Sequence, residues 1–153
     1  MKIEDELKSK FSSEYHKLLV NIHLTSSRLG ERMESEMKKH DLTATQYNVL
    51  RILRGQHKRP ASIGLIKDRM IERNSDVSRI IDRLVKKELI ERTENQTDRR
   101  QKDVVISDKG LKVLAAIDNL ENRIMDQLGH LSKQEVDTLN NLLDKARSKD
   151  DYL

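Results

Sequence analysis

The sequence predicts a mainly α-helical protein with one small β-hairpin, an α+β fold dominated by helices. Three observations support this class. Apolar residues recur at steps of three and four over most of the 153 residues, the spacing becomes strand-like only between residues 89 and 106, and the chain has one Pro and five Gly. Because only 3% of the residues are aromatic, the core must be built from Leu, Ile, Val and Met.

The N-terminal part of the chain, from Ile3 to about Lys39, predicts one long amphipathic helix. Steps of three and four connect its apolar residues, which are Phe11, Tyr15, Leu18, Leu19, Ile22, Leu29, Met33 and Met37. A helix of this length usually packs on a partner or spans between modules. We therefore expect it to take part in assembly.

Three shorter helices are predicted next. Thr43 and Gln46 form a capping-box pattern that opens the first of them, which stops near Gly55. Ser62 can cap the second. The third starts at about Ser75 and places apolar residues on one face, namely Val77, Ile80, Ile81, Leu84 and Val85.

A hairpin and two further helices complete the chain. Residues 89–93 and 104–106 predict two short strands that are joined by a polar turn. Ser107 or Asp108 then caps a helix, and Ser132 with Glu135 forms a second capping box. The order of elements is that of a winged helix-turn-helix with long terminal helices.

The domain organisation follows from this order. We expect residues 1–40 to form an N-terminal dimerisation helix, residues 41–106 a winged helix-turn-helix DNA-binding lobe, and residues 107–153 the C-terminal dimerisation helices. The outer helices have no core of their own, so their apolar stripes predict a homodimer. The residues expected at its interface are Phe11, Leu18, Leu120, Ile124, Leu139, Leu142 and Leu143. A monomer whose ends pack within one chain is the alternative.

Candidate DNA-reading residues lie at the start of the third short helix. A helix-turn-helix places the first turn of its second helix against base edges in the major groove, and Ser, Asn and Arg can hydrogen-bond there. The residues concerned are Asn74, Ser75, Asp76, Ser78 and Arg79, with Arg83 one turn further on. Residues 51–102 also hold 15 Lys and Arg against 8 Asp and Glu, a basic excess that suits a polyanion. The alternatives are that Asn74 or Ser75 is only a cap, and that Lys86 and Lys87 are only solvated.

The run from Ser75 to Gly110 resembles the MarR family of bacterial transcriptional regulators. The matching segments are V-S-R at 77–79, D-R-L at 82–84, L-I-E-R at 89–92, D-R-R at 98–100 and I-S-D-K-G at 106–110. The resemblance implies a homodimer that binds a pseudo-palindromic operator in double-stranded DNA, with half-sites about 10 base pairs apart. It also implies a ligand-responsive repressor that a small-molecule effector releases.

The resemblance extends to the wing and to the effector. It implies that the wing carries Asp98, Arg99, Arg100 and Lys102, with Arg100 in the minor groove and Asp98 as its positioner. Whether Arg99 or Arg100 enters the groove stays open. Effectors of the family often bind between the dimer helices and the DNA-binding lobe, which here includes Tyr15, Leu19 and His23.

Two residues depart from the family pattern. Glu88 stands where the family usually has Gly after the recognition helix, so we expect a strained left-handed backbone there. Asp76 stands where Ser or Thr is more frequent, which changes the expected base preference.

Other function classes find little support in the sequence. Without Cys there is no disulfide framework, thiolate chemistry or Cys-based zinc site, and no catalytic or cofactor motif is present, so we expect no enzyme, no cofactor and no metal. His16 and His23 are separated by roughly 10 Å of helix rise, which leaves only a site between helices or chains that uses His16, His23, His40 or His130. Without a signal peptide or an apolar run long enough to cross a membrane, we expect a cytoplasmic protein. A protein–protein adaptor that uses its winged helix without DNA is the main rival.

Overall fold

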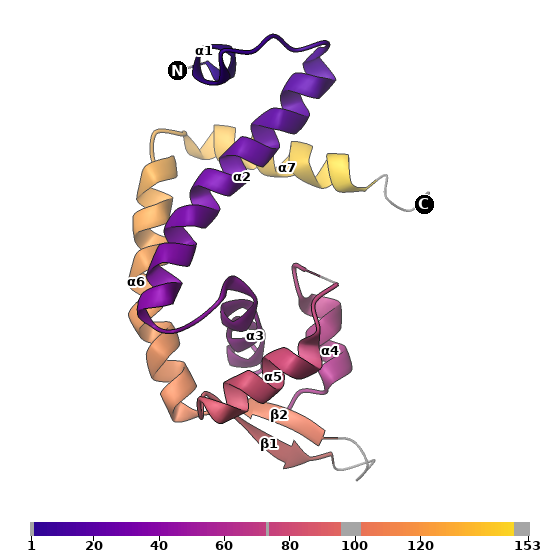
Figure 1. The fold of residues 1–153 in the computed structure, drawn as a ribbon, viewed down its shortest axis with the longest axis vertical. Coiled ribbons are helices and arrows are strands. Elements are labelled where there is room, and N and C mark those ends of the chain that lie inside the picture. The colour runs from indigo at the N-terminus through magenta and orange to yellow at the C-terminus, as the bar shows by residue number, and fades with distance from the viewer. Residues whose placement is uncertain (1, 73, 96–101, 149–153) are drawn as a thin grey trace. The chain divides into compact units, whose positions relative to one another are not determined.

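The structure, a computed structural model of the chain, describes residues 2–72, 74–95 and 102–148, apart from the side chains of residues 32 and 119–127. These residues form, in order, α1 (Ile3–Leu7), α2 (Glu14–Lys39), α3 (Ala44–Arg54), α4 (Ile63–Arg69), α5 (Val77–Lys86), β1 (Ile90–Glu94), β2 (Lys102–Ile106), α6 (Asp108–Leu128) and α7 (Lys133–Arg147). The predicted fold class, mainly helical with one small hairpin, is therefore confirmed. Figure 1 shows α3, α4 and α5 gathered over the hairpin.

The chain divides into two compact units. The first ends at Asp118 and the second begins at Asn119, so α6 starts in one unit and ends in the other. The first unit contains the short helices and the hairpin, and it holds all the described residues that were predicted to read DNA.

The N-terminal segment is not the single helix that its apolar spacing predicted. Lys8 has a φ of 47°, in the left-handed region, and α2 begins only after Ser13. Ser13 forms an N-cap, because its backbone is extended and its Oγ accepts a hydrogen bond from the His16 N–H at 3.1 Å. The prediction of one helix over residues 3–39 was therefore wrong at its N-terminal end.

Side-chain caps begin three of the helices at the predicted positions. Thr43 and Gln46 each accept a hydrogen bond from the other's backbone N–H, at 3.2 Å in both directions. Ser132 and Glu135 form the same reciprocal pair at the start of α7, and Ser62 caps α4. Each cap satisfies backbone donors that the helix itself leaves unpaired, and its replacement by Ala costs about 1 kcal/mol.

The hairpin is slightly longer than predicted and is joined by a third short segment. β1 and β2 are antiparallel, with Ile90 opposite Ile106. Ala61 exchanges two backbone hydrogen bonds of 2.9 Å with Val104 and so extends the sheet by one bridge. All four of these side chains are buried, so this edge of the hairpin is attached to the lobe.

One apolar core spans the lobe from the end of α2 to the first half of α6. Its largest fully buried side chains are Leu50, Leu53, Ile66, Ile81, Leu84, Ile90, Leu114, Ile117, Val49 and Val104. Full burial of an aliphatic side chain of this kind contributes about 1.5–3 kcal/mol. The core therefore fixes the positions of α5 and of the hairpin against α3, α4 and α6.

α5 ends in a left-handed turn at Glu88. The Glu88 N–H donates to the Val85 carbonyl at 2.9 Å, and the Leu89 N–H donates to the Leu84 carbonyl at 3.0 Å. This is the hydrogen-bond pattern of a Schellman motif, whose residue after the cap is usually Gly. Glu88 has a φ of 62°, so the left-handed backbone expected there is observed.

The start of α6 lies directly against this turn. The Ser107 Oγ donates to the Glu88 carbonyl at 2.7 Å and accepts from the Gly110 N–H at 3.0 Å. A Cβ atom on Gly110 would lie 2.2 Å from the Leu89 carbonyl oxygen and 2.9 Å from Cγ1 of Ile106. Only glycine allows the two backbones to approach this closely.

We expect Gly110→Ala to lower the free energy of unfolding by about 2 kcal/mol, because the added methyl group forces the α6 and Leu89 backbones apart. Urea unfolding followed by circular dichroism measures this change. Gly30→Ala is the matched control. A Cβ on Gly30 meets nothing within 4 Å, and Ala in a helix interior is about 1 kcal/mol more favourable than Gly, so this variant should be stabilised. Equal stabilities for the two variants would contradict the close approach.

We also expect Glu88→Gly to be more stable than Glu88→Ala by about 1 kcal/mol, because glycine alone removes the left-handed strain. The Glu88 carboxylate pairs with the Lys109 ammonium at 2.9 Å. Both variants lose this ion pair equally, so the comparison isolates the backbone. Thermal and urea unfolding of the two variants provide the measurement. A Gly variant no more stable than the Ala variant would show that Glu88 adopts its conformation without strain.

Candidate nucleic-acid interface

Asp76 caps the helix that was predicted to read DNA. Its Oδ1 accepts a hydrogen bond from the Arg79 N–H at 3.2 Å, and its negative charge is favoured at a helix N-terminus. The helix start expected at about Ser75 is therefore corrected to Val77, and the alternative of a cap at Asn74 or Ser75 is corrected to Asp76. Ser75 instead donates its Oγ hydrogen bond to Oε2 of Glu72 at 3.3 Å, within the turn that precedes α5.

The predicted reading residues lie on the outward side of α5. Val77, Ile81 and Leu84 are buried in the lobe, so the remaining sides of the helix face solvent. Ser75 is half-buried. The exposed members of the predicted set are Asn74, Asp76, Ser78, Arg79 and Arg83.

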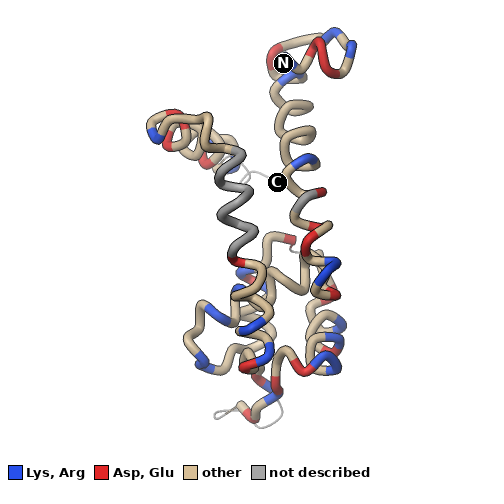
Figure 2. The backbone as a smooth tube through the Cα atoms, turned by 90° about the vertical axis from the view of Figure 1, so that its left-hand side faces the viewer, with Lys and Arg blue, Asp and Glu red and all other residues tan. Residues whose placement is uncertain are grey.

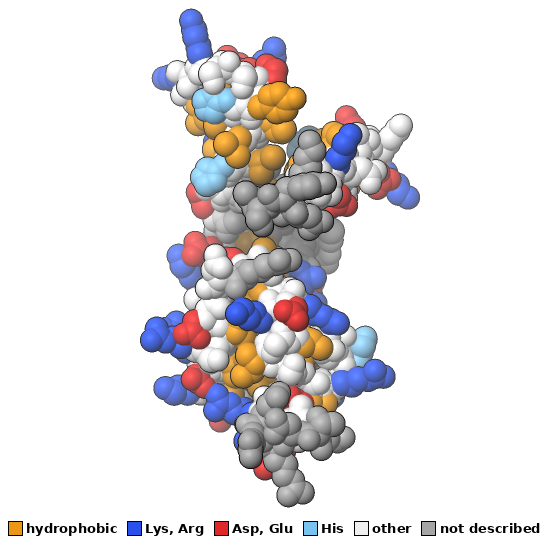
Figure 3. All heavy atoms as spheres, turned by 90° about the vertical axis from the view of Figure 1, so that its right-hand side faces the viewer, with side chains coloured by type: hydrophobic (Ala, Val, Ile, Leu, Met, Phe, Trp, Pro, Cys, Tyr) orange, Lys and Arg blue, Asp and Glu red, His pale blue; other side chains and the backbone are white. Residues whose placement is uncertain are grey.

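Figure 3 shows the face of the lobe that carries α4 and the beginning of α5. Lys and Arg side chains lie around a central group of apolar side chains on this face, with Asp and Glu side chains between them. Lys and Arg side chains so placed suit the phosphates on either side of a DNA groove.

Arg79 is held only loosely. Its side chain is 81% exposed, and its Nε lies 3.3 Å from Oδ2 of Asp76. An exposed ion pair contributes about 1 kcal/mol at most. Arg79 can therefore leave Asp76 and pair bidentately with a guanine at little energetic cost.

Arg83 lies one turn beyond Arg79 and borders a shallow pocket of about 330 Å³. The pocket is formed where α5 passes the junction of α2 and α3. Its other lining residues are Lys38, Asp41, Leu42, Thr43, Gln46 and Lys87. Arg83 therefore lies between the reading end of α5 and this junction.

Lys87 has a structural contact that sequence reasoning missed. Its Nζ lies 3.0 Å from the Asp41 carboxylate, donates to the Asp41 carbonyl and lies 3.4 Å from Oε1 of buried Gln46. From the sequence, Lys87 was expected either to be solvated or to face DNA. The described contacts of Lys87 are instead with other residues of the protein. A contact between residues so far apart in the chain leaves no local sequence signal.

An ion pair connects α5 to the wing. Arg92 on β1 donates to Oδ1 of Asp82 on α5. Both residues belong to segments that resemble the family pattern, but their pairing depends on the turn that reverses the chain at Glu88. Beside this turn, the Lys109 ammonium holds the pKa of the Glu88 carboxyl below its ordinary value.

The wing is described only in part. Lys102 lies opposite Glu94 in the hairpin, and its Nζ is 3.3 Å from the Glu94 carboxylate. Asp98, Arg99 and Arg100, which were predicted at the wing tip, lie outside the described residues. Their expected roles remain predictions.

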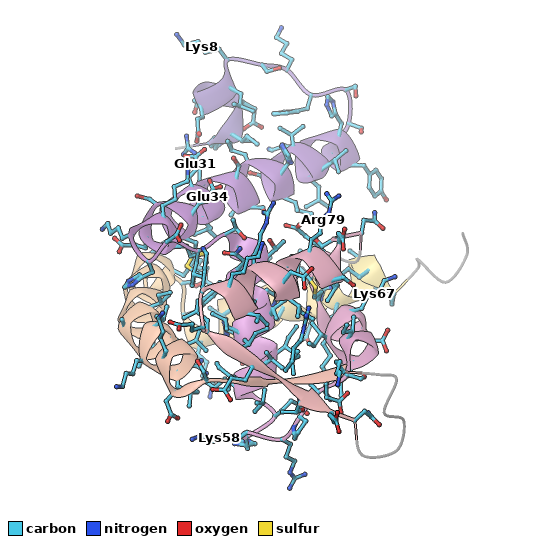
Figure 4. The ribbon with its side chains drawn as sticks, turned by 60° about the horizontal axis from the view of Figure 1, so that its bottom comes forward. Lys8, Glu31, Glu34, Lys58, Lys67 and Arg79 are labelled. Atoms are coloured by element: carbon cyan, nitrogen blue, oxygen red, sulfur yellow. The ribbon has the colours of Figure 1, made fainter. Side chains whose placement is uncertain are left out.

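A second basic segment lies apart from this surface. Lys58 is on the loop between α3 and α4, and Figure 4 shows it on the other side of the hairpin from Arg79. Its Nζ lies 3.0 Å from Asp108, and this ammonium holds the pKa of the Asp108 carboxyl below its ordinary value. Figure 2 likewise shows Lys and Arg positions spread over the helices with Asp and Glu between them. The Lys and Arg residues that give residues 51–102 their basic excess therefore do not form a single surface patch.

With the exception of Phe11, the residues predicted for assembly and for effector binding lie on long helices. On α2, Leu18 and the predicted effector residues Tyr15, Leu19 and His23 are exposed. Phe11 lies before the start of α2 and is half-buried against the His16 ring. On α7, Leu139 and Leu142 are exposed and Leu143 is half-buried. Leu120 and Ile124 belong to α6, but their side chains are outside the description.

The described part of the chain has neither a membrane-spanning helix nor a cluster of metal ligands. No helix there is long and apolar enough to cross a membrane. No group of three or more His, Asp or Glu side chains in that part is arranged to hold a metal ion.

Comparison with known proteins places this arrangement in a family. Residues 42–102 match the model of the MarR family. The regulator MhqR of Bacillus subtilis, an HTH-type transcriptional regulator, is 27% identical over 131 residues, which cover 85% of this chain and 89% of MhqR.

Two solved structures extend the likeness to about nine tenths of the chain. A MarR transcription factor from Planctomyces limnophilus is 32% identical, with a TM-score of 0.67 and 88% and 98% of the two chains covered. A mutant of MarR from E. coli, solved in complex with operator DNA, is 25% identical, with a TM-score of 0.76 and 90% and 99% covered. With a winged helix-turn-helix, long terminal helices and these relatives, the chain belongs to the MarR family.

Proposed function

We propose that this protein is a sequence-specific DNA-binding transcriptional regulator that binds a pseudo-palindromic operator as a homodimer. The main support for the proposal is that the first turn of α5 is polar and exposed. The opposite side of the helix packs on the buried core of the lobe. The relative from E. coli, solved with operator DNA, supports the same use of the fold. The function is that of a regulator in the cytoplasm rather than of an enzyme.

Base reading is assigned to the first turn of α5. Ser78 and Arg79 are exposed beside Asp76, and the unpaired amides of a first helical turn carry partial positive charge that suits a phosphate. Arg79 supplies the donor pair that guanine accepts in the major groove. In the absence of DNA, Asp76 keeps the Arg79 side chain near the helix start. On DNA, a guanine takes the place of Asp76 as the partner of Arg79.

The wing supplies the second part of the interface. In the sequence, Arg99 and Arg100 follow β1 and precede Lys102, the first residue of β2. An arginine there can enter a narrow minor groove, whose negative potential attracts it. Asp98 acts as the positioner of Arg100, as the family resemblance implies.

Dimerisation is assigned to residues 1–40 and 107–153, and DNA binding to residues 41–106. Exposed apolar side chains on α2 and on α7 support this division, since a second copy of the chain would bury them. Closed two-fold symmetry then gives the two half-sites of a pseudo-palindrome.

Regulation by a small-molecule effector is part of the proposal. Tyr15, Leu19 and His23 present one phenol, one apolar side chain and one imidazole on the same exposed helix. Enclosure of a ligand by these three requires the apposed surface of a second copy. Release of the operator on ligand binding would make the protein a repressor.

We expect Arg79→Ala to weaken operator binding by about 10- to 100-fold and to relax base preference at one position of each half-site, since a bidentate arginine–guanine pair contributes about 1–3 kcal/mol. Fluorescence anisotropy with single-base operator variants measures both effects. Arg147→Ala, on α7, is the matched control and should bind as wild type does. A fully retained base preference in Arg79→Ala would contradict the assignment.

We expect Arg100→Ala to weaken operator binding more than tenfold at unchanged thermal stability, because the minor-groove contact is lost while the core is untouched. Gel shifts with Arg99→Ala in parallel show which of the two arginines enters the groove. If both variants bound the operator as tightly as wild type, the wing assignment would be wrong.

Footprinting on the DNA upstream of the protein's own gene tests the function as a whole. A protected pseudo-palindrome is expected, with a binding constant that falls steeply with salt in proportion to the phosphates contacted. Absence of binding to any duplex would favour the protein–protein adaptor.

A further inference from the structure

Ile71 is an apolar side chain left in solvent beside the reading helix. It is 86% exposed, a fraction that only Tyr15 equals among the large apolar side chains of the described residues. Ile71 follows α4 and precedes Asp76, the cap of α5, by five positions. A single exposed apolar residue is ordinary on a protein surface. Exposure alone therefore does not indicate a function for Ile71, and its position in the fold must do so.

The backbone at Ile71 is fixed on both sides. Met70, the preceding residue, is 4% exposed and belongs to the lobe core. The Ile71 N–H donates to Oδ1 of Asn48 on α3 at 3.1 Å. Isoleucine is also restricted in its first side-chain torsion because it is branched at Cβ. The apolar side chain is therefore presented to solvent from a rigid base.

The segment that carries Ile71 joins α4 to α5. In a helix-turn-helix the first helix crosses the DNA backbone and the second places its first turn against base edges. Here α4 is the first helix and α5 the second, so Ile71 lies on the stretch that joins them. The only apolar group that bases present in the major groove is the C5 methyl of thymine.

We propose that Ile71 packs against a thymine methyl group in each operator half-site and so determines part of the sequence specificity. This inference rests on the proposed function, since it requires the lobe to bind DNA through α5. Its chain neighbour Glu72 is exposed and charged. A single methyl group suits such an isolated apolar contact better than a protein partner, whose interface would need on the order of 1,000 Å².

The experiment removes the methyl group from the DNA and the side chain from the protein. A duplex is first enriched from a random library with the wild-type protein. Each thymine of the duplex is then replaced in turn by deoxyuridine, which lacks only the C5 methyl, and the Kd is measured for wild type and for Ile71→Ala. Thermal unfolding checks that the variant folds.

We expect one thymine per half-site at which deoxyuridine weakens wild-type binding by about three- to tenfold. Ile71→Ala should be weakened by a similar factor on the thymine duplex and should not respond to deoxyuridine at that position. Ile63→Ala, which shortens a partly exposed isoleucine at the start of α4, is the matched control and should keep the full response.

Two results would overturn the contact. One is an Ile71→Ala variant that responds to every deoxyuridine as wild type does. The other is an equal loss of affinity on thymine and deoxyuridine duplexes at all positions, which would mean that Ile71 acts elsewhere. Failure of the wild-type protein to enrich any duplex would instead overturn the proposed function, and this outcome is separate from the first two.

Discussion

The chain reversal at Glu88 and Leu89 is the constraint on which the lobe depends. The Leu89 N–H closes α5, while its carbonyl accepts from the Ser107 N–H at 3.1 Å and occupies the space next to Gly110. The end of α5, the start of β1, the end of β2 and the start of α6 therefore share one set of backbone contacts. None of the predicted reading residues takes part in it. The direction of α5 is set independently of its first turn, so the reading side chains can differ between related proteins without loss of the fold.

Two ion pairs beside this reversal connect α5 to its surroundings. Lys87 joins the C-terminal end of α5 to Asp41, where α2 turns into α3, and Arg92 joins β1 to Asp82. The exposed pair with Arg92 contributes about 1 kcal/mol at most. The ion pair matters more for orientation than for stability, because it holds β1 of the hairpin beside α5. The contacts of Lys87 give α2 a direct link to α5, so a shift of α2 caused by an effector would reach the reading helix through its C-terminal end.

Local signals in the sequence predicted most of the fold, and long-range contacts account for what they missed. The caps at Thr43 and Ser132 depend on residues three positions away, so the sequence displays both partners together. The break before Ser13 was missed because apolar spacing continues across it, and a cap of one serine is a weaker signal than that periodicity. The pairing of Asp82 with Arg92 requires the intervening reversal. Apolar stripes predicted the assembly residues, but the surface of the second chain on which they would pack leaves no local pattern in the sequence.

The basic excess of the middle third of the chain overstates the charge available to DNA. Several of its cations are engaged in ion pairs inside the lobe, namely Arg54 with Asp118, Lys58 with Asp108, Lys87 with Asp41, Arg92 with Asp82 and Lys102 with Glu94. Arg54 holds Asp118 with two bonds of 2.9 and 2.7 Å. These pairs orient elements, so their cations can meet phosphates only by giving up a contact within the protein. The cations available for phosphate contacts are therefore fewer than the basic excess suggests, and the non-specific part of the affinity is smaller by the same measure. Discrimination between operators must then come from the few side chains that reach base edges, which gives each contact of Arg79 and Ile71 a large share of the specificity.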